Sequence, residues 1–137
     1  MLINKIWNQI DCEKEYAPFM YGEAVNKIDI LEYLNKNNLS LTELNIQFIE
    51  RYGHGIVGNY ELHGINKDNG IAFWSEKYRH ELALELNNPT IIGYDATSGY
   101  PIGFEESDSR IFIYDLEYEV KEFIFDSFEK MLEAILD

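Results

Sequence analysis

Few residues of this 137-residue chain have the type and spacing that catalysis or metal binding requires. The three histidines, His54, His63 and His80, fall in a predicted turn, strand and helix. None has a second histidine or cysteine three or four residues away, which is the helical spacing typical of zinc sites. The single cysteine, Cys12, lacks the sequence context of a nucleophile. The sequence therefore predicts no metal site, no cofactor and no catalytic residue, and we expect a protein that is not an enzyme.

Carboxylates concentrate in a loop between two predicted strands, at Glu105, Glu106 and Asp108. Carboxylates held close together can act as general acids and bases or as calcium ligands. These three lack the spacing of a calcium-binding loop, and acidic side chains are rarely buried without partners. A solvated hairpin turn is the simpler interpretation. The stretch 53–58 likewise lacks the glycine and lysine spacing of a phosphate-binding loop.

The negative charge of the chain is large and unevenly distributed. The formal net charge is −14, and residues 105–137 contain 11 acidic against three basic residues, which accounts for −8 of it. Such a chain repels nucleic acid and anionic lipid, so we expect neither nucleic acid nor a membrane as a partner. A basic protein surface would be attracted, with association faster by roughly 10- to 1,000-fold at low salt.

The partner-binding residues predicted from this pattern are acidic, with one aromatic anchor. Carboxylates on one surface with few compensating cations could occupy a basic cleft that a nuclease presents to nucleic acid. Tryptophan contributes strongly at the centres of interfaces, although it lies more often in the core. The predicted set is Glu105, Glu106, Asp108, Asp115, Glu117, Glu119 and Trp74.

Helical periodicity dominates the part of the chain before residue 53. Apolar residues at 2, 3, 6 and 10 predict a short N-terminal helix, followed by a turn-prone stretch at 16–22. A second helix is predicted with Ile28, Leu31 and Leu34 on its buried face. Ser40 and Glu43 have the spacing of a capping box for a third helix, which Gly53 would end.

The period then changes to that of strands. Residues 60–64 predict a half-buried strand, and the turn at 66–70 predicts a hairpin. Ser75 could cap a middle helix with an apolar stripe through Trp74 and Leu86. Strands at 90–94, 100–104 and 110–114 predict a meander, and a further strand near 120–125 precedes a final helix that Asp126 could cap.

This order of elements predicts an α+β fold with a mostly antiparallel sheet, around which N-terminal helices, a middle helix and a C-terminal helix pack. No repeat or linker divides the chain, so a single domain over 1–137 is expected. The longest strictly apolar run, at 71–74, is far shorter than the roughly 20 residues of a membrane span. The N-terminus lacks the features of a secretory signal, which predicts a cytoplasmic location.

Several segments resemble the SUKH superfamily in order and spacing. They are the helix end at 48–55, the meander through 92–95 and 99–104, the strand 110–115, and the final stretch 126–132, which contains Ser127-Phe128. The resemblance covers residues 27–136 and leaves 1–26 as an N-terminal extension. It implies a toxin-immunity protein that binds and neutralises a cognate bacterial toxin, and it implies no catalytic residues.

Two other functions remain open from the sequence. The superfamily also includes fungal regulators of cell-wall glucan synthesis, so a regulatory adaptor of the same fold that binds a host protein is the first alternative. The second is a small-ligand protein or enzyme whose site assembles only in space. A deep pocket that gathers His54, His63 or Cys12 would favour this second alternative.

Overall fold

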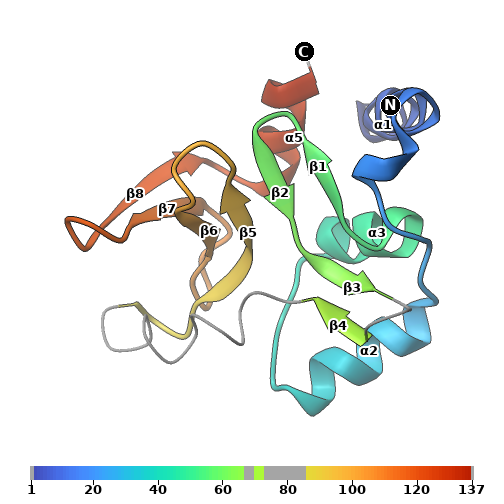
Figure 1. The fold of residues 1–137 in the computed structure, drawn as a ribbon. Helices are drawn as coiled ribbons and strands as arrows, with labels where there is room; N and C mark the ends of the chain where they lie inside the picture. Colours follow the sequence, from blue (N-terminus) through green and yellow to red (C-terminus); the bar gives the residue numbers. More distant parts are fainter. Residues whose placement is uncertain (1, 67–69, 73–85, 137) are drawn as a thin grey trace.

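The computed structural model describes residues 2–66, 70–72 and 86–136 (Figure 1). Within these residues an α+β fold is present, as predicted. The elements are α1 (Leu2–Tyr16), η1 (Pro18–Met20), α2 (Lys27–Lys36), α3 (Glu43–Tyr52), β1 (Gly55–Val57), β2 (Tyr60–Leu62), β3 (Gly64–Asn66), β4 (Gly70–Ala72), β5 (Thr90–Asp95), β6 (Pro101–Phe104), β7 (Ile111–Asp115), β8 (Val120–Phe125) and α5 (Phe128–Leu136).

The main sheet has six antiparallel strands in the order β1-β2-β5-β6-β7-β8, and β3 pairs with β4 in a separate hairpin. From β5 onward each strand pairs with the next along the chain, so the predicted meander is confirmed. The hairpin predicted around 66–70 is also confirmed. β1 was not predicted, because Gly53 and Gly55 indicated only a helix end. Gly55 is instead the first residue of a strand that pairs with β2.

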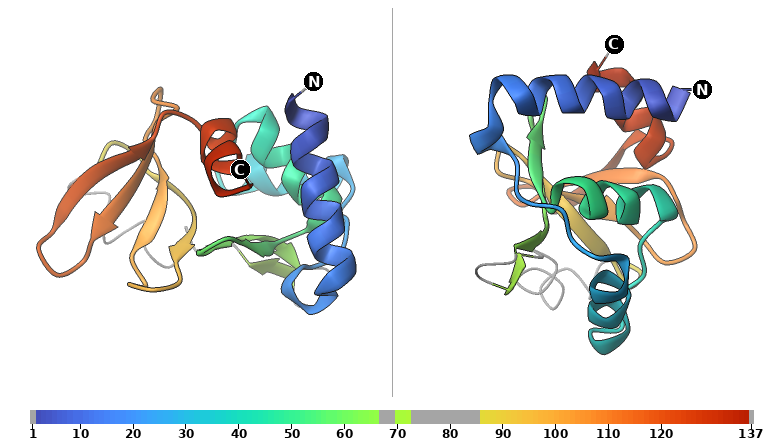
Figure 2. Two further views of the ribbon diagram at one scale, coloured as in Figure 1. Left: turned by 90° about the horizontal axis from the view of Figure 1, so that it is seen from above. Right: turned by 90° about the vertical axis from the view of Figure 1, so that its right-hand side faces the viewer.

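Three helices cover one face of the sheet. Figure 2 shows α1, α3 and α5 gathered on the same side of the strands. They contribute apolar side chains such as Ile10, Tyr52 and Met131 to one buried cluster with the strand residues Ile92 and Ile102. Burying this much apolar surface is the main force that holds the layers together. The N-terminal helix is therefore part of the main core.

The opposite face of the sheet carries a smaller apolar cluster. Neighbouring strand residues point to opposite faces, so Ile91 lies on the other side from Ile92. Ile91 packs there with Leu86, Phe112 and Tyr114, all of which are buried. Most of the predicted middle helix, including Trp74, lies at 73–85 and is outside the described residues.

The second helix is present, but two of the three residues predicted on its buried face are exposed. Ile28 is 70% exposed and Leu31 is 46% exposed. Leu34 is buried as predicted, and it packs with Ile30 and Tyr33 against α3 and β3. Two apolar stripes with the same helical spacing overlap on α2, and contact with α3 selects one of them.

Two predicted helix caps are each displaced by one or two residues. The side chain that caps α3 is Thr42, whose Oγ1 accepts a hydrogen bond from the Asn45 N–H at 3.3 Å, so the capping box from Ser40 is wrong. At α5 the cap is Ser127, whose Oγ accepts from the Lys130 N–H at 3.1 Å. Asp126 was the predicted cap. In both cases the observed residue is the last one before helical backbone begins.

The predicted end of α3 is confirmed. Gly53 has a φ of +74°, a positive value that favours glycine over residues with a Cβ, and its N–H donates to the Ile49 carbonyl at 2.8 Å. Within the described ranges, none of the helices combines the length and apolar character needed to span a bilayer.

Candidate functional site

The six predicted acidic residues lie in two separate turns, one at each end of β7. Glu105, Glu106 and Asp108 belong to the β6–β7 turn, which we call the inner turn (residues 105–109). Asp115 ends β7, and Glu117 and Glu119 follow in the β7–β8 turn, which we call the outer turn (residues 115–119). Residues 110–114, four of which belong to β7, separate the two turns by roughly 15 Å. Trp74, the seventh predicted residue, lies outside the described residues.

Most of the charge of the inner turn is neutralised within the molecule. Asp108 accepts two hydrogen bonds from the Arg110 guanidinium, at 3.1 Å from Nε and 2.8 Å from Nη2. These bonds lower the pKa of Asp108 to about 2. Glu105 binds the Lys121 ammonium, and its side chain is only 11% exposed. The sequence predicted that these two carboxylates carry free charge on the surface, but in the structure both are paired with cations of the same molecule.

Glu105 is held on more than one side. Besides the ion pair with Lys121, its Oε2 accepts the Asn87 N–H at 2.8 Å. Burial alone would raise the pKa of Glu105, but the hydrogen bonds from Lys121 and Asn87 together lower it. A carboxylate fixed by these contacts acts as a structural link between the inner turn, β8 and the chain before β5.

A groove of about 780 Å³ lies between the inner turn and the chain that connects α2 to α3. Three of its lining residues, Asn38, Asn88 and Ser107, have positive φ angles, of 54°, 42° and 63°. Such angles are uncommon for residues other than glycine and recur at functional sites. The groove is lined by Asn38, Leu39, Ser40, Leu41, Thr42, Asn88, Thr90, Phe104, Glu105, Glu106, Ser107, Asp108 and Ser109.

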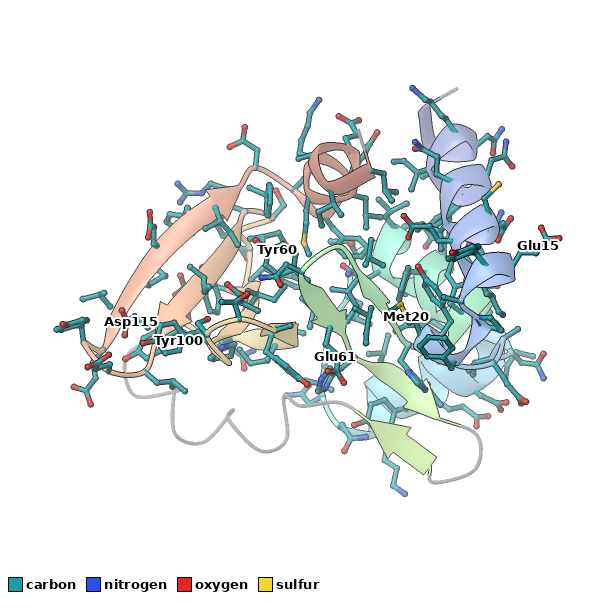
Figure 3. All side chains as sticks on the ribbon, turned by 45° about the horizontal axis from the view of Figure 1, so that its top comes forward. Glu15, Met20, Tyr60, Glu61, Tyr100 and Asp115 are labelled. Carbon is teal, nitrogen blue, oxygen red and sulfur yellow. The ribbon has the colours of Figure 1, made fainter. Side chains whose placement is uncertain are left out.

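The outer turn is a fixed structure that presents exposed carboxylates, one of which, Glu117, accepts a hydrogen bond from the Tyr100 hydroxyl at 3.5 Å. The Asp115 Oδ1 accepts the N–H groups of Glu117 and Tyr118, both at 2.9 Å, and the Asp115 carbonyl accepts the Glu119 N–H at 2.8 Å. Figure 3 shows Asp115 beside Tyr100 from the neighbouring turn. Burial and the nearby carboxylates of Asp115 and Glu117 raise the pKa of the Tyr100 phenol. Glu117 and Glu119 themselves are exposed.

Exposed apolar side chains alternate with these carboxylates. Leu116 is 39% exposed, Tyr118 is 73% exposed and Val120 is 54% exposed. Sequence reasoning missed all three as site residues, although the alternation Leu-Glu-Tyr-Glu-Val is a recognisable signal. Such alternation normally indicates a strand with one buried face. Here the β7–β8 hairpin extends past the helices (Figure 2). The side chains on that face are therefore exposed to solvent.

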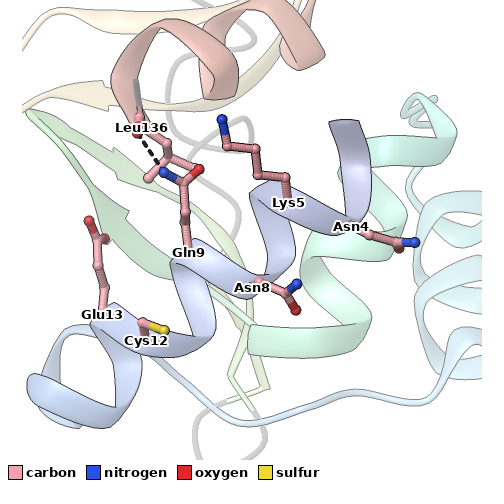
Figure 4. A pocket seen from close by; sticks show the side chains of 7 residues that line it. All are labelled: Asn4, Lys5, Asn8, Gln9, Cys12, Glu13 and Leu136. Carbon is pink, nitrogen blue, oxygen red and sulfur yellow. Dashed lines mark hydrogen bonds between the residues drawn. The ribbon is translucent and has the colours of Figure 1, made fainter. Parts of the chain in front are cut away.

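The groups that could support catalysis lie apart. Cys12 is exposed on α1 in an open groove of about 560 Å³, whose lining residues include neither His54 nor His63 (Figure 4). His54 is packed against Gly22. His63 lies beside Glu61, with 4.0 Å between Nε2 and Oε1. In the part of the chain that the structure describes, no three His, Cys, Asp or Glu side chains converge to hold a metal ion.

The residues around His63 form a local polar cluster. The Tyr94 hydroxyl donates to the Glu61 carboxylate, and the rings of Tyr94 and His63 meet edge to face with centroids 5.3 Å apart. The hydrogen bond to Glu61 is the main reason that the pKa of Tyr94 is raised to about 12. A phenol with such a pKa keeps its proton, so it serves as a hydrogen-bond donor that joins β5 to β2.

No protein-family model matches the chain. No curated protein matches it either.

Proposed function

We propose that this protein binds a basic protein partner through the outer turn, and that the partner is a cognate bacterial toxin which it neutralises as an immunity protein. The observation that carries the proposal is the outer turn itself. It presents Glu117 and Glu119 from a turn whose backbone is held by Asp115. A site that is ordered before binding loses less conformational entropy when it binds.

The distribution of cations supports a basic partner. Arg110 and Lys121, the cations nearest to the two turns in the chain, are paired with Asp108 and Glu105 of the inner turn. None of the ion pairs among the described residues involves the exposed carboxylates of the outer turn, which are therefore accessible to an incoming cation. Complementary charge accelerates encounter and excludes partners of like charge. A nuclease toxin, whose cleft must attract phosphate, is one partner of suitable chemistry.

The resemblance to the SUKH superfamily supports a binding role without catalysis, and toxin immunity is the role that we propose. The segments that resemble it include the meander and the stretch at 126–132, which form the last strands of the sheet and the start of α5. The proposed action takes place in the cytoplasm, requires no cofactor and involves no catalytic residue. A regulatory adaptor that binds a host protein is the alternative outcome of the test below.

The test is co-expression with the product of the gene adjacent to its own, with growth and complex formation as readouts. We expect the wild-type chain to protect growth and to form a complex. Glu117→Gln with Glu119→Gln should weaken that complex by about tenfold or more, most strongly at low salt. The matched control is Glu15→Gln with Glu32→Gln, which removes the same charge; Figure 3 shows Glu15 on the opposite side of the molecule from Asp115.

Each outcome has a separate meaning. Protection that is lost in the outer-turn variant and kept in the control supports the proposal. Protection that survives in both variants keeps immunity and excludes the outer turn as its site. Absence of both complex and protection overturns immunity and favours the adaptor.

A further inference from the structure

The main sheet has one covered edge and one open edge among the described residues. At β1, Tyr21 forms an antiparallel bridge with Gly55, and the Gly22 N–H donates to the His54 carbonyl at 2.9 Å. At the other end, β8 pairs with β7, and no described strand pairs with its second side. In Figure 1, β8 lies at the outer limit of the sheet. A strand in this position presents unpaired N–H and C=O groups.

Apolar exposure is concentrated beside this edge. Nine large apolar side chains of the described residues are exposed, and four of them lie between residues 116 and 123. These four are Leu116, Tyr118, Val120 and Phe123. Val120 and Phe123 point to opposite faces of β8, so apolar exposure follows the strand on both of its faces.

The usual protection of an edge strand is weak here. Proteins shield such edges with proline, with lysines that point outward, or with bulges. β8 contains no proline, and its one lysine, Lys121, is turned back to Glu105. The register shift opposite Ile111 and Phe112 lies at the far end of β8, toward Phe125. The part from Val120 to Phe123 therefore stays open to another strand.

A second copy of the chain is a poorer occupant of this edge than a basic segment, because two registers of a symmetric pair oppose like charges and every register brings together two chains of net charge −14. In a symmetric antiparallel pair the two-fold axis is perpendicular to the sheet, so the central residue faces its own equivalent. Centring on Glu122 places two carboxylates opposite each other, and centring on Lys121 places two ammonium groups opposite each other. Like charges directly opposite are destabilising. The net charge of −14 adds repulsion between copies.

We infer that β8 accepts an extended segment of a basic protein as an added strand, in which lysine or arginine alternates with apolar residues. Glu122 and Phe123 point to opposite faces of β8, so an opposing strand would place a cation at Glu122 on one face and an apolar side chain at Phe123 on the other. Main-chain hydrogen bonds would supply affinity, and the side-chain alternation would supply specificity. This inference rests on the proposed function and adds the mode of binding and the class of segment recognised.

The test uses a peptide of about eight residues that alternates lysine and valine, a length close to that of a typical strand. We expect saturable shifts of the β8 backbone amides in NMR spectra of the labelled full chain and slower hydrogen exchange along β8. Two control peptides are an alternating glutamate–valine peptide and a lysine–valine peptide with a central proline, which cannot complete the ladder. Equal binding of the proline peptide, or shifts confined to the outer turn, would overturn strand addition.

A pair of variants checks the position of the site. Val120→Lys places an outward lysine on the open edge and should weaken binding of the lysine–valine peptide by about tenfold. Ile28→Lys makes the same charge change at a 70% exposed position on α2 and should leave binding unchanged. Unchanged NMR spectra and thermal unfolding of the free variants confirm that both fold. Equal affinity of the two variants would contradict the inference.

The same variants separate this inference from the proposed function. If Val120→Lys still protects growth while the Glu117 and Glu119 variant does not, immunity through the outer turn stands and strand addition is overturned. If the peptide binds β8 as expected but the adjacent gene product is neither bound nor neutralised, the edge is a strand-binding site and immunity is overturned.

Discussion

The Arg110 guanidinium lies over the ring of Phe123, with Cζ 3.7 Å from the ring centroid. The Lys121 ammonium is 4.8 Å from the same centroid. Both cations are bound at the same time by inner-turn carboxylates, Asp108 and Glu105. Ion pairs and cation–π contacts therefore connect the inner turn to the strand that borders the outer turn. This link is the reason that the two acidic turns differ in their free charge.

The pairing of Asp108 with Arg110 predicts a specific acid dependence of stability. Because the folded-state pKa of Asp108, about 2, is below its ordinary value of 3.8, this pair stabilises fully above about pH 4 and loses its effect as the pH falls toward 2. Asp108→Asn should therefore flatten the fall of the urea midpoint between pH 4 and pH 2. Glu15→Gln is the charge-matched control, and parallel slopes for Asp108→Asn and wild type would contradict the prediction.

Glu119 should be replaceable by glycine with a gain in stability. Its φ is +57°, a region that costs residues with a Cβ roughly 1 kcal/mol and that glycine enters freely. Glu119→Gly should raise the free energy of unfolding by about 0.5–1 kcal/mol while it weakens partner binding, because it removes a free carboxylate. Glu117→Gly, in the same turn at negative φ, should not stabilise. Equilibrium unfolding in urea measures both, and equal effects of the two changes would refute the backbone explanation.

The hydroxyl group of Tyr52 should stabilise the packing of α1 against the core. That hydroxyl donates to the Asp11 Oδ1 at 2.7 Å and lies 3.3 Å from the Trp7 carbonyl, and the residue is 1% exposed. Burial, followed by the hydrogen bond to Asp11, raises the pKa of Tyr52. Tyr52→Phe should lower the free energy of unfolding by about 1 kcal/mol and speed hydrogen exchange in α1. Tyr118→Phe, at a 73% exposed position, should change neither.

Substitution by alanine should destabilise the protein at both Gly99 and Gly103, but for different physical reasons. A Cβ at Gly103 would lie 2.0 Å from the Thr90 carbonyl oxygen, so paired strands β5 and β6 would have to separate. A Cβ at Gly99 would meet nothing within 4 Å, and only its φ of +76° opposes the change. Gly99→Ala should cost about 1 kcal/mol, and Gly103→Ala should cost several times more. Thermal and urea unfolding of both variants measure the loss of unfolding free energy in each. Similar losses would contradict the prediction, because they would show that β5 and β6 separate at little cost.

Much of the fold follows from local pattern. The spacing of apolar residues located α1, α2, α3 and α5, and alternation located the strands of the meander, because these periods are properties of the elements themselves. The caps were less predictable, since Ser40 and Thr42 both carry a suitable hydroxyl group and only the observed chain path makes Thr42 the cap. Three-residue strands such as β1 contain too few residues for a pattern.

The candidate site was only partly predictable for a related reason. The excess of acidic residues after 105 is a property of composition, so it can be counted directly along the chain. Whether each carboxylate is free depends on cations that are distant in sequence, as Lys121 is from Glu105. The exposure of Tyr118 and Val120 depends on how far the hairpin extends beyond the helices.

The sequence by itself determined where α1, α2, α3, α5 and the strands of the meander form, and that the last quarter of the chain is strongly acidic, because propensity, periodicity and charge are local properties. Only the tertiary structure decided which stripe of α2 is buried, which carboxylates are neutralised and which edge of the sheet stays open. Those outcomes depend on contacts between segments far apart in the chain, as when Tyr21 bridges Gly55 at one edge while no described strand pairs with the outer side of β8 at the other.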